Sequence, residues 1–159
     1  GDVGEARDAG SRPWRARAVH AAEGMIYLLD TNVVSELRRP KPHGAVLAWI
    51  ADIASENLRL SALTVGEIQA GIELTREQDQ AKAQALEQWL DEVEMSFAVL
   101  PMDAETFRVW ARLKHRKSDT LFEDAMIAAT AMVHGLTVAT RNVRDFEDFG
   151  VALINPFEN

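Results

Sequence analysis

The stretch "YLLDTNVVSE", residues 27–36, places Asp30 at the end of a short apolar run that predicts a buried strand. Two more short polar side chains, Thr31 and Asn32, follow at once. Asp, Thr and Asn all cap helix N-termini, because their side-chain oxygens accept hydrogen bonds from the first free N–H groups. The stretch therefore predicts a strand that ends at Asp30 and a helix that begins beside it. Taken alone, it assigns Asp30 a structural role.

The same alternation of apolar runs and helical patterns continues along the chain after Met25. Strands are predicted at residues 26–29, 58–61, 97–100, 137–139 and 151–154. Helices are predicted between them, at residues 45–54, 75–94 and 122–134 among others, the last ending at Gly135 as a C-terminal cap. This order predicts an α/β fold with a short, mostly parallel sheet of about five strands flanked by helices. Ligands of such sheets collect at the carboxyl ends of the strands.

Composition narrows the class of protein. The 159 residues include no cysteine, which excludes disulfides and thiolate metal sites and fits a cytoplasmic protein. No apolar run approaches the roughly 20 residues of a membrane span. The net charge of −8 argues against non-specific electrostatic binding of the protein surface to nucleic acid. An acidic pocket that holds divalent cations can still approach phosphates through the ions.

Residues 1–24 differ in composition from the rest of the chain: they contain four arginines and no lysine, and their apolar residues show no sustained periodic spacing. We predict that they are an extension, non-native or from an upstream start codon, and that the domain proper covers residues 25–159. The arginines could also pack near Asp30 and Asp124, since guanidinium groups pair with carboxylates.

Glu67 lies one turn into the helix predicted in "LSALTVGEIQAGIE", residues 60–73. Thr64-x-x-Glu67 has the spacing of a capping box, in which the glutamate reaches back to the N–H of the capping residue. Gly71, four residues on and on the same helix face, instead leaves the space beside this carboxylate open. Both a capping role and a site role stay open for Glu67.

Asp124 stands in the first turn of the helix predicted in "TLFEDAMIAATA", residues 120–131. The helix dipole favours a negative charge there. Thr120-x-x-Glu123 is a second possible capping box, and it would leave Asp124 without a capping role. The small Ala128 clears the helix face on which Asp124 stands. A role beyond capping is therefore indicated for Asp124.

Asp145 follows the fourth predicted strand by a short loop, in "VATRNVRDF", residues 138–146. A loop aspartate is usually a cap or turn residue. Thr140 and Asn142 add short polar groups beside it.

Together these residues place four acids near one edge of a parallel sheet, which capping does not require. Bare carboxylates would repel by about 4 kcal/mol per pair at 4 Å in an effective dielectric near 20. Divalent cations remove that repulsion, and oxygen ligands suit Mg²⁺ or Mn²⁺. The histidines show no spacing typical of a zinc site; they are His20, His43, His115 and His134. The sequence therefore predicts a site for Mg²⁺ or Mn²⁺.

Four segments, in this order, resemble the signature blocks of PIN-domain ribonucleases. Within that family the resemblance is closest to the toxins of type II toxin–antitoxin pairs, the VapC and FitB-like group. It covers residues 25–157, and the four blocks in order at fitting separations are specific. They are "IYLLDTNVVSEL" (26–37), "TVGEIQAGI" (64–72), "EDAMIAATA" (123–131) and "VATRNVRDF" (138–146).

The resemblance implies a three-layer PIN-like domain over residues 25–159 and an Mg²⁺- or Mn²⁺-dependent endoribonuclease. It implies that the metal-binding and catalytic residues are Asp30, Glu67, Asp124 and Asp145. Their polar neighbours at the metal water or the scissile phosphate would be Asn32, Thr140 and Asn142. The implied partners are the RNA substrate, a second copy in a homodimer, and a cognate antitoxin in a heterotetramer or larger complex. The antitoxin, and not this chain, would bind DNA. The role of Glu123 stays open.

Two other functions fit part of the pattern. A haloacid-dehalogenase-type phosphatase also has an aspartate at the end of its first strand, but its motif needs an acid two residues on, where this chain has Asn32. The later lysine and paired-aspartate block is also missing. A catalytically inactive PIN domain that acts only as a binding module is the other alternative. The intact set of four acids argues against it.

Overall fold

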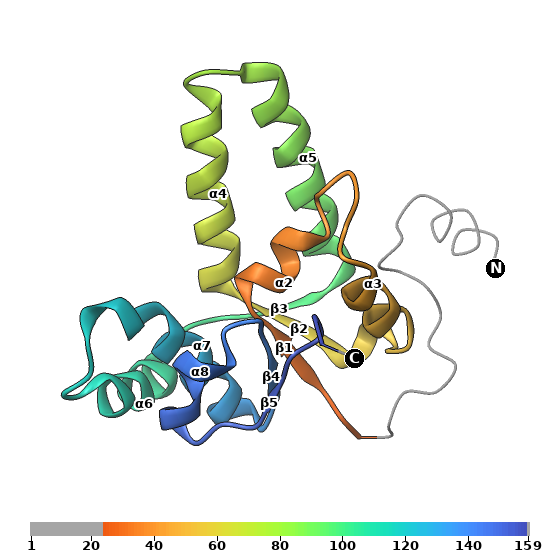
Figure 1. Cartoon of the computed structure of the whole chain (residues 1–159). Coiled ribbons are helices and arrows are strands. Elements are labelled where there is room, and N and C mark those ends of the chain that lie inside the picture. Colours follow the sequence, from red (N-terminus) through yellow and green to blue (C-terminus); the bar gives the residue numbers. More distant parts are fainter. Residues whose placement is uncertain (1–23, 159) are drawn as a thin grey trace.

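A five-stranded parallel sheet forms the centre of the protein (Figure 1). The computed structural model describes residues 24–158. The strand order is β3-β2-β1-β4-β5, and every neighbouring pair is parallel. The strands are β1 (Tyr27–Leu29), β2 (Leu58–Ser61), β3 (Ala98–Leu100), β4 (Thr137–Ala139) and β5 (Leu153–Ile154). The predicted sheet is confirmed. The extension predicted over residues 1–24 lies outside the described residues except for Gly24, as does any contact of its arginines.

Helices cover both faces of the sheet. They are α2 (Thr31–Glu36), α3 (Gly44–Ala51), α4 (Ala62–Arg76), α5 (Gln80–Ser96), α6 (Ala104–Lys114), α7 (Phe122–His134) and α8 (Val143–Phe146). Three short 3₁₀ turns lie in the connections of this part of the chain: η2 (Ser55–Asn57) before β2, η3 (Asp119–Leu121) before α7 and η4 (Glu147–Phe149) after α8. Side chains alternate across the strands, so Leu29 packs with α2, α3 and α5 while Leu28 packs with α7 and α8. The three-layer α/β arrangement is confirmed.

Helices α4 and α5 form a hairpin that extends away from the sheet (Figure 1). The helix predicted over residues 75–94 is wrong at its start, because Thr75 and Arg76 still belong to α4. The chain turns at residues 77–79, and Asp79 caps α5 by accepting from the Lys82 N–H at 3.0 Å. Ile72, Ala83 and Leu90 form a small core between the two helices. No helix of the described part of the chain has the length and apolar character of a membrane span.

Other predicted boundaries differ by a few residues. Helix α3 ends at Ala51 and not at residue 54, and β5 is limited to Leu153–Ile154. The predicted C-terminal cap at Gly135 is confirmed, since this residue has the left-handed φ of 67° that closes α7.

The register of the central strands brings three polar positions together. Leu29 of β1 pairs with Leu60 of β2 and with Ala139 of β4. The residues that follow each pairing, Asp30, Ser61 and Thr140, therefore emerge side by side at the carboxyl edge of the sheet.

Candidate active site

Asp30 is the buried centre of the site, with only 5% of its surface exposed. It caps α2, since its Oδ1 accepts a 2.8 Å hydrogen bond from the Thr31 N–H. Its other oxygen, Oδ2, accepts from the Thr140 hydroxyl at 2.7 Å and from the Asn32 side-chain amide at 3.1 Å. Burial raises the pKa of Asp30, and these hydrogen bonds act against that rise. Asp30 is therefore both a cap and a carboxylate that three hydrogen bonds hold at the sheet edge.

Asn32 and Thr140 tie the first and fourth strand ends together. Asn32 Oδ1 accepts from the Arg141 N–H at 3.2 Å, and its amide nitrogen lies 3.4 Å from Thr140 Oγ1. Thr140 Oγ1 also accepts from the Asn142 N–H at 3.0 Å. All three predicted polar neighbours thus lie within one hydrogen-bond network around Asp30.

Glu67 does not form the capping box that its spacing allowed. Helix α4 begins one turn earlier than that motif requires, and Ser61 caps it by accepting from the Leu63 N–H at 3.1 Å. Thr64 is buried inside the helix, with its hydroxyl 3.0 Å from that of Thr31. Glu67 instead accepts a 3.1 Å hydrogen bond from the Thr31 hydroxyl, across to α2. The capping interpretation of Glu67 is wrong.

Burial is the main reason that the pKa of Glu67 is raised, to about 7. The adjacent Glu123 carboxylate and the charge of Asp30 raise this pKa further, and the hydrogen bond from Thr31 lowers it. Glu67 therefore changes its charge close to neutral pH.

Asp124 faces the same acids from the first turn of α7. Burial raises its pKa to about 6, and the charges of Asp30, Asp145 and Glu123 add to the rise. The second predicted capping box is also wrong, because α7 begins at Phe122 without a side-chain cap and Thr120 lies in η3.

Asp145 lies at the edge of this group. It stands in α8, where it is exposed and its N–H donates to the Asn142 carbonyl at 3.1 Å. Its charge contributes to the raised pKa of Asp124. Asp145 lines a neighbouring hollow together with Arg141 and Arg144.

A hollow of about 320 Å³ connects these groups at the carboxyl edge of the sheet. Three of the four predicted acids line it, Asp30, Glu67 and Asp124, together with Glu123. Sequence reasoning assigned no site role to Ser35, which also lines it. The available signal was the spacing of four residues from Thr31, which places both hydroxyls on one face of α2.

The donor set fits a hydrated divalent cation. Within residues 24–158, no three acidic or histidine side chains are arranged to hold one ion together. Mg²⁺ commonly keeps several waters and binds through one or two carboxylates. Asp30, Glu67 and Asp124 share one hollow, and mutual repulsion contributes to the raised pKa values of Glu67 and Asp124, which a cation would relieve. A joint role of all four acids as ligands stays a prediction.

Comparison with known proteins gives a consistent result. The family model of the PIN domain matches residues 27–151. The chain is 37% identical to Toxin FitB of Neisseria gonorrhoeae, over 83% of this chain and 99% of that protein. It is 39% identical to VapC ribonuclease Y4jK of Sinorhizobium fredii, over 82% of this chain and 97% of that protein. The crystal structure of FitAcB from Neisseria gonorrhoeae superposes with a TM-score of 0.77 at 36% identity, covering 84% of this chain and all of that chain.

Proposed function

The chain belongs to the PIN domain family, and from that premise we propose that it is a metal-dependent endoribonuclease that acts as the toxin of a toxin–antitoxin pair. One observation carries the proposal: three carboxylates from separate elements, Asp30, Glu67 and Asp124, line one hollow at the carboxyl edge of the sheet. The similarity to a protein named VapC ribonuclease supports RNA as the substrate. The similarity to Toxin FitB supports the role as a toxin.

A bound Mg²⁺ or Mn²⁺ would supply an activated water and neutralise charge on the phosphodiester. Asp30 would be the fixed ligand of this ion, because three hydrogen bonds hold its carboxylate in place. Asp124 and Glu67 bring further negative charge to the same hollow from α7 and α4. Asp145 stands beside them and completes the proposed set of four acids.

Glu67 is suited to accept the proton of the attacking water. It lines the same hollow as Asp30 and Asp124, so a Glu67 oxygen that is free of metal would lie beside the attacking water as a general base. The Thr31 hydroxyl holds one Glu67 oxygen at 3.1 Å and so fixes the direction of the carboxylate. Asn32 and Thr140 keep Asp30 in its ligand position.

The proposal extends to partners and location. The similarity to a protein named as a toxin supports an antitoxin that binds this chain and holds it inactive. We propose a cytoplasmic homodimer that contacts RNA, with DNA binding left to the antitoxin.

Expression in cells followed by sequencing of RNA ends tests this function. The wild-type chain should arrest growth and produce new RNA ends, whereas Asp124→Asn should do neither, since the amide cannot replace the charge. Growth arrest without new ends would favour the inactive binding module. A covalent phosphoryl group trapped on Asp30 would favour the phosphatase.

A further inference from the structure

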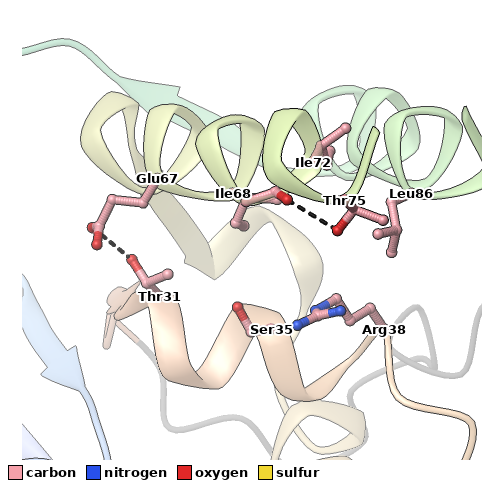
Figure 2. A pocket seen from close by; sticks show the side chains of 9 residues that line it. Thr31, Ser35, Arg38, Glu67, Ile68, Ile72, Thr75 and Leu86 are labelled. Carbon is pink, nitrogen blue, oxygen red and sulfur yellow. Dashed lines mark hydrogen bonds between the residues drawn. The ribbon is translucent and has the colours of Figure 1, made fainter. Parts of the chain in front are cut away.

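A second hollow, of about 230 Å³, lies next to the acidic one between α2 and α4 (Figure 2). It shares Thr31, Ser35 and Glu67 with the acidic hollow. Six further residues line this second hollow and not the acidic one: Arg38, Ile68, Gly71, Ile72, Thr75 and Leu86. The two hollows therefore adjoin, and one chain molecule such as RNA can occupy both.

The two ends of this hollow carry opposite charges. Figure 2 shows Glu67 at one end and the Arg38 side chain at the other, with the guanidinium directed toward Ser35. Within residues 24–158 the guanidinium of Arg38 takes part in no ion pair, whereas neighbouring Arg39 pairs with Glu36 at 3.5 Å. The planar donors of the exposed Arg38 side chain are therefore available to a ligand.

Aliphatic and small residues of α4 and α5 line one side of the hollow. Ile68 and Leu86 supply aliphatic surface, and Gly71 leaves space where any other residue would place a side chain. Figure 2 shows the hydroxyl of Ser35 on the α2 side of the hollow, between Thr31 and Arg38. An unpaired base needs these features, since its faces stack on apolar side chains and its edges form hydrogen bonds.

We propose that this hollow binds one unpaired base of the RNA beside the cleaved bond, and that Arg38 selects guanine there. The inference rests on the proposed ribonuclease function. A guanidinium donates two parallel hydrogen bonds to the O6 and N7 acceptors of guanine. Adenine and cytosine instead present an amino donor on the corresponding edge, and uracil presents a single acceptor.

Two glycines of α4 provide a matched pair of variants. An added Cβ meets nothing within 4 Å at Gly71 or at Gly66, but only Gly71 lines the hollow. The probe is an oligouridine that carries one guanine, and its binding is measured in EDTA, where metal-dependent cleavage stops. Gly71→Leu should weaken its binding by about tenfold or more, because the side chain fills the space for the base. Gly66→Leu should bind like wild type. Melting temperatures check that both variants fold.

Arg38→Lys and Arg39→Lys form a second pair of variants. Each substitution keeps the positive charge and removes the planar guanidinium group with its paired N–H donors. Wild type should prefer the guanine probe over probes with adenine or cytosine by about tenfold. Arg38→Lys should lose this preference while Arg39→Lys keeps it.

Equal binding of all probes by wild type, or unchanged binding by Gly71→Leu, would overturn the inference. A Gly71→Leu variant that no longer binds the antitoxin but still binds the guanine probe like wild type would also overturn it. The hollow would then be the binding site of a partner protein. If the protein binds the guanine probe preferentially but does not cleave the matching ribo-oligonucleotide, the base-binding site is supported. The same result would refute the ribonuclease function.

Discussion

Replacing Glu67 with glutamine should stabilise the metal-free protein at pH 8. The pKa of this group rises from 4.5 to about 7 because burial and the neighbouring acids disfavour its charge. At pH 8 such a rise corresponds to at most about 3 kcal/mol. The group is only partly buried, so solvent screening reduces this to about 1–2 kcal/mol. Glutamine removes the charge and keeps an acceptor for the Thr31 hydroxyl. The melting temperature should rise by roughly 3–6 °C.

The direction of the pH dependence follows from linkage. A carboxyl whose pKa is raised by folding is protonated more readily in the folded state, so its contribution to stability is complete below pH 4.5. That contribution is lost as the pH rises through the folded pKa of about 7. The advantage of Glu67→Gln should therefore be absent at pH 4 and grow between pH 4.5 and 7.

Calorimetric melting in EDTA from pH 4 to pH 8 is the assay. Glu73→Gln on the same helix is the control, because Glu73 is exposed and pairs with Arg76, which lowers its pKa. That variant should gain no stability at pH 8. If Glu67→Gln melts below wild type at both ends of the pH range, Glu67 supports the helix and the charge-repulsion account is refuted.

Three further predictions concern the site and the assembly. Mg²⁺ or Mn²⁺ at about 100 times its dissociation constant should stabilise the wild type by about 2.7 kcal/mol at pH 8. Asp30→Asn should lose most of this gain; a calorimetric titration without binding to wild type would contradict the metal site. Thr140→Val should cost about 1–3 kcal/mol in urea unfolding, because Asp30 loses a buried 2.7 Å hydrogen bond; a neutral effect would count against the network. Light scattering at micromolar concentration should give a dimer, and a strict monomer would contradict the proposed assembly.

The sheet could be predicted because four of its five strands are short, mostly apolar runs followed by a polar residue or a proline. Leu28 and Leu29, for example, are followed by Asp30. The break between α4 and α5 was missed for a physical reason. Residues 75–94 are nearly all helix formers without glycine or proline, and Asp79 alone marks the start of α5.

The two capping boxes show why motif spacing cannot settle a cap. A cap depends on where the preceding element ends, and β2 ends at Ser61, so Ser61 and not Thr64 caps α4. Likewise η3 runs through Thr120 and leaves no cap position there.

The meeting of Asp30, Glu67 and Asp124 could be predicted because parallel strands deliver their carboxyl ends to one edge. The contact of Thr31 with Glu67 could not, because it joins residues 36 positions apart on two helices whose packing the pattern does not specify.

Cleavage of a mixed-sequence RNA by the purified chain tests the central claim most directly. Wild type should cut the RNA with Mg²⁺ or Mn²⁺ and stop in EDTA, and Asp30→Asn should be inactive at every metal concentration while melting cooperatively. Equal cleavage by wild type and Asp30→Asn, or equal cleavage in EDTA, would contradict the account.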